Sequence, residues 1–275
     1  MATSKGSVVT IGAFDGLHLG HRRVIEDVAR LAGELGLESV VVTFDRHPAS
    51  VVRPESAPLL LTDLDQKLAL LHTTPTDHVE VIPFTRERAN ESAEDFVTEV
   101  LVGELSARVV VVGRDFHFGR GREGNVALLE KMGQSYDFSV IPFDLVGDSG
   151  EGSSGEIISS TRIRGLIEAG DLEGAAALLG RPHEVRGVVA APVSGYSGAG
   201  EGSESASVEV PEEILLPPPG GYKARAGRVE TAGGKPAELA DCHVMVPAGG
   251  SLAVLGVTEP WPPGTAVRVL FEAPE

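Results

Sequence analysis

The sequence predicts two folds in succession, a doubly wound parallel α/β sheet followed by a small all-β, barrel-like domain. Up to residue 182, short β-branched runs alternate with helical patterns, which is typical of a parallel sheet covered on both faces. From residue 183, short strand-like runs are separated by Gly, Pro and Ser clusters, as in a small barrel or sandwich. With 275 residues available, we expect one domain over 1–182 and a second over 183–275.

The helices and strands of the first domain are predicted from the periodicity of apolar residues and from the Gly and Pro residues that interrupt it. Along the first helical pattern, Val24, Ile25, Val28, Leu31 and Leu35 share one face. The expected strands are Ser7–Ile11, Ser39–Phe44, His78–Pro83, Arg108–Gly113 and Phe138–Phe143. The expected helices are Gly20–Gly36, Leu61–Leu71, Ser92–Leu105, Gly124–Met132, Thr161–Ala169 and Leu172–Leu179. Residues 145–156 are Gly, Ser and acidic, and we expect a mobile loop there.

The second domain reads as a series of short strands. They are expected at Glu184–Ala190, Ala206–Val210, Tyr222–Val229, Cys242–Val246, Leu252–Val257 and Ala266–Phe271. Residues 195–205 are rich in Gly and Ser, which predicts a flexible loop between the first two strands.

Composition limits the compartment and the partners. Lys and Arg number 23 against 40 Asp and Glu, for a formal charge of −17, which disfavours nucleic acid and anionic membranes as partners. The single cysteine, Cys242, rules out an intramolecular disulfide and fits a reducing compartment. Residues 1–7 contain no apolar signal-peptide core, and no apolar run reaches membrane-spanning length. We expect a cytoplasmic protein whose anionic substrates need a locally basic pocket.

The most informative stretch is Thr10-Ile-Gly-Ala-Phe-Asp-Gly-Leu-His-Leu-Gly-His21. It places a buried strand, a glycine turn and a helix start in succession, and the free N–H groups and dipole of a helix start favour phosphate. His18 and His21 are three residues apart, so both imidazoles point the same way on a helical turn. Such a pair suits charge stabilisation at a phosphorus centre, although a plain surface helix with two incidental histidines would show the same spacing.

Two further stretches lie at predicted strand ends. Thr43-Phe-Asp-Arg-His-Pro48 places His47 after a strand, with Pro48 fixing the turn. Gly113-Arg-Asp-Phe-His-Phe-Gly119 alternates Phe116 and Phe118 with polar residues, and their rings either stack on a flat ligand or belong to the core.

The fourth stretch, Ile158-Ser-Ser-Thr-Arg-Ile-Arg164, precedes a predicted helix. Its hydroxyls can cap that helix, or together with the N–H groups they can hold phosphate oxygens. Arg162 can add a bidentate guanidinium contact.

Taken in order, these stretches resemble the bacterial FAD synthetase family of the HxGH nucleotidyltransferases, over roughly residues 7–190. The first matches the family's F-D-G-x-H-x-G-H pattern, the fourth its I-S-S-T-x-[IV]-R segment, and Leu178-Leu-Gly-Arg-Pro182 its closing segment. The resemblance implies a Rossmann-like fold and transfer of AMP from ATP to FMN, giving FAD and pyrophosphate. It implies Mg²⁺ arriving with ATP, and we expect no dedicated protein metal site.

The resemblance also implies the site residues. We expect His18, His21 and Arg162 to be catalytic. The implied ATP-binding residues are Gly12, Ala13, Phe14, Asp15, His18, Gly20, His21, Gly113, Asp115, Ser159, Ser160, Thr161 and Arg162. The implied flavin-binding residues are Phe44, His47, Pro48, Phe116, Phe118 and Asn125.

The second domain departs from the family pattern. Bifunctional members carry a riboflavin kinase barrel with a P-T-A-N segment whose Thr and Asn hold Mg·ATP. Here Arg186-Gly-Val-Val189 matches the opening of that barrel, but the P-T-A-N residues are absent. We expect a degenerate barrel without kinase chemistry. Two alternatives remain, namely the same transfer with another acceptor or nucleotide, which Arg46 also motivates, and a flavin- or nucleotide-binding regulatory protein without turnover.

Overall fold

The computed structural model describes residues 5–144, 157–192, 204–229, 238–248, 251–257 and 261–274. The chain divides into two compact units, one of residues 1–58 and 67–158, the other of residues 59–66 and 159–275. The boundary expected between residues 182 and 183 stays a prediction. The loop expected at 145–156 lies outside the described residues, as does 195–203 of the second expected loop.

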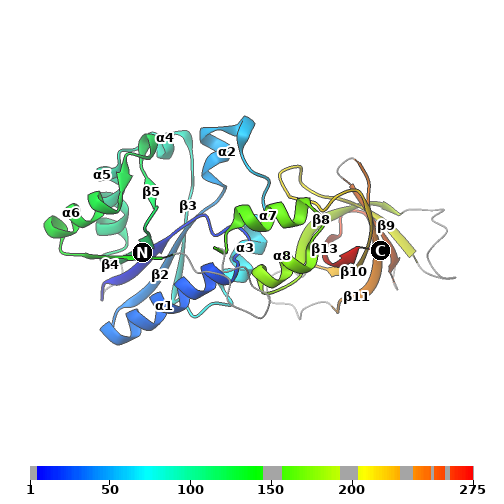
Figure 1. Cartoon of the computed structure of the whole chain (residues 1–275), viewed down its shortest axis with the longest axis horizontal. Coiled ribbons are helices and arrows are strands. Elements are labelled where there is room, and N and C mark those ends of the chain that lie inside the picture. Colours follow the sequence, from blue (N-terminus) through cyan, green and yellow to red (C-terminus); the bar gives the residue numbers. More distant parts are fainter. Residues whose placement is uncertain are drawn as a thin grey trace. The chain divides into compact units, whose positions relative to one another are not determined.

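The first unit is built on a five-stranded parallel sheet of order β3-β2-β1-β4-β7 (Figure 1). Its strands are β1 (Ser7–Ile11), β2 (Glu38–Phe44), β3 (His78–Ile82), β4 (Ala107–Gly113) and β7 (Ser139–Phe143). The chain moves outward from β1 through β2 to β3, then returns to place β4 on the other side of β1. This reversal leaves the carboxyl ends of β1 and β4 side by side, which is where doubly wound sheets bind their ligands.

Helices cover both faces of this sheet, as the alternation of patterns predicts. Their bounds are α1 (Leu19–Leu35), α2 (Pro48–Val52), α3 (Leu64–Leu71), α4 (Arg86–Ala89), α5 (Ala93–Phe96) and α6 (Val126–Tyr136). Three short 3₁₀ or π segments join them: η1 (Pro54–Ser56), η2 (Val97–Glu104) and η3 (Arg120–Arg122). On one face, Val24 and Val28 of α1 pack against Val109 and Val111. On the other, η2 and α6 bury a larger cluster against β1, β2 and β4.

The helix expected over Ser92–Leu105 is two different structures. α5 spans Ala93–Phe96, and η2 continues as a π-helix over Val97–Glu104. The apolar stripe of the prediction, Phe96, Val100 and Leu101, is nevertheless buried. Sequence analysis also missed a two-stranded hairpin of β5 (His117–Phe118) and β6 (Gly124–Asn125), within the third chemical stretch.

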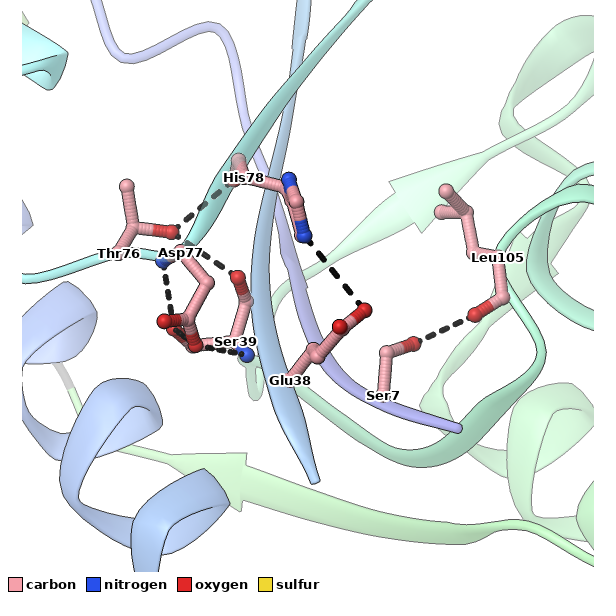
Figure 2. Close-up of polar contacts among 7 residues, drawn as sticks. All are labelled: Ser7, Glu38, Ser39, Thr76, Asp77, His78 and Leu105. Atoms are coloured by element: carbon pink, nitrogen blue, oxygen red, sulfur yellow. Dashed lines mark hydrogen bonds and ion pairs between the residues drawn. The ribbon is translucent and has the colours of Figure 1, made fainter. Parts of the chain in front are cut away.

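The amino edge of the sheet is held by side-chain hydrogen bonds (Figure 2). The carboxylate of Asp77 accepts from the backbone N–H of Ser39 at 2.8 Å and from its hydroxyl at 2.7 Å, and the same bonds lower the pKa of Asp77. The hydroxyl of Ser7 donates to the carbonyl of Leu105 at 2.7 Å. These contacts fix the strand entries, on the edge opposite the chemical stretches.

The second unit joins two helices to a closed barrel. α7 (Ser160–Glu168) and α8 (Leu172–Leu179) pack together, and α8 also packs on β8 and β13. The barrel runs β10-β11-β12-β9-β8-β13, with every pair antiparallel. Its strands are β8 (His183–Pro192), β9 (Glu204–Glu209), β10 (Gly220–Arg228), β11 (Ala240–Val246), β12 (Ser251–Val257) and β13 (Ala266–Pro274). The expected all-β second fold is therefore confirmed as a barrel.

The barrel's strands alternate buried apolar and more exposed side chains, as β10 shows with Tyr222, Ala224 and Ala226 buried. This period of two is what a closed sheet with a filled interior requires. Within the described part of the chain, no helix combines the length and apolar character needed to cross a bilayer.

Candidate nucleotide site

The carboxyl edge of the parallel sheet gathers three of the four chemical stretches. The first follows β1, the second follows β2 and the third follows β4. Since β2 and β4 both pair with β1, the first stretch lies between the other two. The topology therefore brings together stretches that lie far apart in the sequence.

His18 is the N-cap of α1. Its Nδ1 accepts the backbone N–H of His21 at 3.2 Å, so this nitrogen carries no proton and the ring presents Nε2 as its other polar atom. The side chain is 4 % exposed. The cap thus fixes the His18 ring at the helix start, where the other first-turn N–H groups are available to an anion.

The rings of His18 and His21 stack with centroids 3.6 Å apart and 16° between their planes. Phe14 meets the His21 ring edge-on at 5.1 Å. Burial, and then the neighbouring His18, hold the pKa of His21 well below its usual 6.5, so this imidazole is neutral near pH 7. Its Nδ1 is buried without a hydrogen-bond partner among the described residues.

That nitrogen is an unsatisfied polar atom beside the N-terminus of α1. Leaving a buried polar atom unpaired costs about 1–3 kcal/mol, and native structures keep few such atoms. A phosphate group at the α1 N-terminus would bring negative charge and hydrogen-bond acceptors to this corner of the sheet.

The loop between β1 and α1 has an unusual backbone. Phe14, Gly16 and Leu17 have φ of 48°, 79° and 35°, in the left-handed region that costs non-glycine residues energy. Both apolar side chains are buried, at 5 % and 0 % exposure, and their packing offsets that cost. A Cβ on Gly12 would lie 3.2 Å from the Phe14 ring, and one on Gly20 would lie 3.2 Å from the His18 ring. The glycines therefore let these rings lie close against the backbone.

Ala13 and Asp15 belong to the same loop. The carbonyl of Ala13 accepts hydrogen bonds, and the Asp15 side chain is 5 % exposed. The predicted residues from Gly12 to His21 thus form one compact structure at the end of β1, although their contacts with ATP stay a prediction.

The second stretch forms a helix start. His47 is the N-cap of α2, with its Nδ1 accepting the N–H of Ala49 at 3.1 Å, and Pro48 occupies the first helical position. Phe44 is half-buried and meets Phe84 edge-on at 5.2 Å. Capping accounts for one ring nitrogen of His47, and its role toward a flavin stays a prediction.

Arg46 pairs locally within this stretch. Its guanidinium lies 3.1 Å from the carboxylate of Asp45, whose other oxygen accepts the N–H of Phe84 at 2.8 Å. Burial alone would raise the pKa of Asp45, but these two partners outweigh it and lower the pKa. The guanidinium of Arg46 is therefore held by Asp45 beside the end of β2.

The third stretch places aromatic rings at the edge of the core. Phe116 and Phe118 stack at 5.4 Å, and Phe96 lies 5.7 Å from Phe118. Both are half-buried and pack on the same core cluster as Phe44. The two interpretations of the sequence therefore combine, because the rings belong to the core and still present exposed surface.

The polar residues of this stretch sit at turns and caps. A Cβ on Gly113 would lie 3.0 Å from a carboxylate oxygen of Asp115, which is exposed beside the end of β4. Asn125 caps α6, its side-chain oxygen accepting the N–H of Leu128 at 3.0 Å. Gly119 and Gly124 allow close packing on Ala93, since a Cβ on either would lie 2.7 Å from that residue.

The fourth stretch leaves the first unit and begins α7. The carbonyl of Ile158 would lie 3.6 Å from a Cβ on Gly20, so the chain passes beside the first stretch at this point. Ser159 follows and caps α7, its hydroxyl accepting the N–H of Arg162 at 3.2 Å. Ser160 and Arg162 are half-buried and Thr161 is exposed in the first turn of this helix. Their position toward ATP stays a prediction.

Sequence analysis missed a buried lysine near this edge. Lys67 of α3 is 7 % exposed, and its ammonium donates to the carbonyls of Ala13 and Phe44. The signal was present in the sequence, since Lys67 falls on the same helical face as Leu64 and Leu71. In the described ranges, no three His, Cys, Asp or Glu side chains are grouped so that they could hold a metal ion.

Comparison with known proteins places these features in a family. The chain is 35% identical over 188 residues to an Escherichia coli K12 protein named bifunctional riboflavin kinase/FMN adenylyltransferase. A protein of the same name from Buchnera aphidicola of Acyrthosiphon pisum is 33% identical over 186 residues. Each match covers 68% of this chain and 58% of the relative, so the chain spans little more than half the length of these proteins in the match.

Two further comparisons bear on the extent of the likeness. A relative from Geobacillus thermodenitrificans is 38% identical over 180 residues, which make up 66% of this chain and 93% of that protein. A crystal structure described as a macrolide-efflux protein from Streptococcus pneumoniae superposes with a TM-score of 0.77 at 24% identity, covering 100% of this chain and 86% of the other. At that identity the superposition shows the fold alone. Residues 1–162, which contain the four chemical stretches up to Arg162, match the model of FAD synthetase, and the chain belongs to that family.

Proposed function

We propose that this chain is an FMN adenylyltransferase, which transfers AMP from ATP to FMN and releases pyrophosphate. The observation that carries the proposal is the stacked pair of His18 and His21 at the start of α1, beside the carboxyl ends of β1 and β4. The names of the E. coli and Buchnera relatives support the choice of FMN as acceptor.

The reaction needs no covalent intermediate on the protein. A phosphate oxygen of FMN forms a bond to the α-phosphorus of ATP, and the bond from that phosphorus to the bridging oxygen of the β-phosphate breaks. Pyrophosphate leaves with that electron pair, so atoms and charge balance without a proton donor. Catalysis then consists of alignment of the two phosphates and stabilisation of charge in the transition state.

His18 and His21 are assigned to the α-phosphate and the phosphates next to it. A neutral His21 can donate one N–H to a phosphate oxygen, and the first-turn N–H groups of α1 add the attraction of the helix dipole. On the fourth stretch, Ser159, Ser160, Thr161 and Arg162 are assigned to the β- and γ-phosphates. Gly113 and Asp115, at the end of β4, are assigned to the nucleoside part of ATP.

The flavin is assigned to the aromatic side of the edge. Phe44, Phe116 and Phe118 pack on one core cluster and keep part of each ring exposed, which suits contact with a flat ring system. His47 and Pro48 lie at the start of α2 and Asn125 at the start of α6, and these three residues complete the proposed flavin group.

We propose Mg²⁺ as the ion bound to ATP, which would supply positive charge to the phosphates. The exposed carboxylate of Asp115 is an oxygen donor of the kind this ion prefers.

Cys242 of the barrel is buried, and burial, with Asp241 and Glu272 nearby, raises its thiol pKa to about 12, so it is an inert thiol. We keep the cytoplasm as the proposed compartment, with neither nucleic acid nor membrane as a partner.

Riboflavin kinase activity is proposed to be lost. The barrel keeps its closed topology, but the segment between Arg186 and Val210 lacks the Thr and Asn that hold Mg·ATP in bifunctional members. Topology without those groups does not supply phosphate binding.

A substrate panel separates this proposal from its alternatives. The purified chain is incubated with Mg²⁺, each of the common nucleoside triphosphates, and either FMN or riboflavin, and the flavins are separated by chromatography. FAD from ATP and FMN alone supports the proposal. A product with another nucleotide favours the second interpretation, ligand binding without any product favours the regulatory one, and FMN from riboflavin would contradict the loss of kinase activity.

A further inference from the structure

Lys67 is a buried cation that the reaction as described above does not use. Its side chain is 7 % exposed, and lysine is among the residues least often buried without a specific reason. Nζ donates to the carbonyl of Phe44 at 2.7 Å and to the carbonyl of Ala13 at 3.3 Å. The carbonyls of Phe44 and Ala13 therefore both accept from one buried ammonium near the carboxyl edge of the sheet.

The surroundings show why the charge is tolerated there. Burial lowers the pKa of Lys67, while Asp15 and then Asp45 act in the opposite direction. One of these carboxylates lies in the first stretch and the other in the second. Removing a buried cation with such partners is more costly than removing a surface one, because the acceptors remain behind.

The two acceptors belong to different functional segments. Ala13 lies in the loop between β1 and α1, which carries His18, whereas Phe44 ends β2 and precedes His47. The carbonyl of Ala13 also accepts from the hydroxyl of Thr43 at 3.3 Å. Beyond the last residue of β1, the N–H of Gly12 donates to the carbonyl of Val42 at 3.0 Å. Lys67 thus adds to the hydrogen bonds that connect the segments following β1 and ending β2.

We propose that Lys67 is a positioning residue that fixes the Ala13 carbonyl against the Phe44 carbonyl, and so sets the distance between the ATP loop and the flavin side of the site. The inference rests on the proposed function, in which the first loop binds ATP and the end of β2 borders FMN. In-line transfer depends on this distance, because a displacement of about 1 Å between reacting groups costs about 100-fold in rate.

The test replaces Lys67 with methionine, an unbranched side chain one atom shorter, which removes the charge and the donors. Ser39→Ala is the matched control, because Ser39 is a buried hydrogen-bonding residue at the opposite end of β2. Amide hydrogen exchange, the FAD-forming kcat, and KM for ATP and for FMN are measured for wild type and both variants.

For Lys67→Met we expect faster exchange in segments 12–17 and 44–48. We expect kcat to fall about 10- to 100-fold, with each KM within about threefold of wild type, because the lost term is alignment and not uniform binding. For Ser39→Ala we expect faster exchange near the amino edge and a kcat within about twofold.

Equal kcat per folded molecule in the two variants would overturn the proposal, and so would faster exchange spread over the whole sheet. If wild type forms no FAD, the proposed function fails, and hydrogen exchange alone tests the role of Lys67. Unchanged exchange of segments 12–17 and 44–48 in Lys67→Met would then overturn the proposal that Lys67 fixes the two carbonyls. If Lys67→Met does not fold, Lys67→Gln, which keeps two N–H donors, replaces it. In that variant, faster exchange in segments 12–17 and 44–48 with a lower kcat would support the proposal, and unchanged exchange and kcat would overturn it.

Discussion

The ring of His21 stacks on the ring of His18, while the backbone N–H of His21 donates to Nδ1 of the same ring. The three-residue spacing from His18 to His21 therefore both caps α1 and places the two imidazoles face to face. Desolvation of the His21 ring, and then repulsion between two stacked cations, lower the pKa of His21 and keep it neutral. In the proposed reaction the phosphate would meet two rings, one held by the helix cap and the other stacked on it.

His21→Gln should remove most of the adenylyl transfer and leave the fold intact. A single donor aimed at developing charge is worth about 100- to 1,000-fold in kcat. The variant's kcat is compared with that of His78→Gln, an exposed histidine at the amino edge that pairs with Glu38 at 3.5 Å. Normal turnover in His21→Gln, with a normal unfolding curve, would remove His21 from the site.

The lowered pKa of His21 also makes a prediction about stability. Between its folded pKa and 6.5, the unfolded chain binds a proton at this imidazole that the folded chain does not bind. The free energy of unfolding should therefore fall as the pH drops below 6.5. Carboxylates with a lowered pKa, such as Asp77, make the free energy of unfolding depend on pH only near and below their ordinary pKa of 3.8.

Urea unfolding at about pH 7.5 and about pH 5.5 checks this, with His21→Gln as the reference chain. Wild type should lose more stability than the variant over this interval. Parallel losses in the two chains would mean that His21 titrates normally in the folded protein.

Arg162→Ala should weaken ATP more than FMN. The guanidinium is assigned to the triphosphate, on the far side of the α-phosphorus from the flavin. Arg162→Lys keeps the charge but loses the planar fork, so it should recover part of the affinity. KM for each substrate is the measurement, and equal increases for ATP and FMN would contradict the assignment.

Gly124→Ala should disturb the flavin side through packing. The added Cβ would lie 2.7 Å from the Cβ of Ala93 and 2.8 Å from the ring of Phe118, so the β5–β6 hairpin must shift. We expect a loss of about 1–3 kcal/mol in stability and a raised KM for FMN. Gly33→Ala in α1 is the control, because nothing lies within 4 Å of its added Cβ.

That control should gain about 0.5–1 kcal/mol, since alanine favours the helix over glycine. Thermal unfolding of both variants gives the comparison. A stable Gly124→Ala with an unchanged KM for FMN would separate Phe118 from flavin binding.

The sequence predicted the parts of the fold that depend on long, regular apolar patterns. The strands of the parallel sheet and α1 lie within a residue or two of their expected limits. Over Ser92–Leu105, an apolar stripe of about two turns fits both an α-helix and a π-helix, so the pattern could not distinguish η2. The β5–β6 hairpin was too short to produce any alternation.

The candidate site divides in the same way. His18 and His21 follow from local spacing, which a helix start converts directly into geometry. Lys67 does not, because its partners Ala13 and Phe44 come from two other segments and meet it only when the sheet has formed. A charged residue on an apolar helical face was the available sign, but it does not say which carbonyls the charge will find.

The central claim is tested most directly by product stoichiometry. Wild type is incubated with FMN, Mg²⁺ and ATP labelled on the α-phosphorus, and FAD and pyrophosphate are measured over time. The account predicts label in FAD, one pyrophosphate released for each FAD formed, and loss of both products in His21→Gln. Pyrophosphate released without FMN, or FMN left unchanged while ATP is bound, would contradict it.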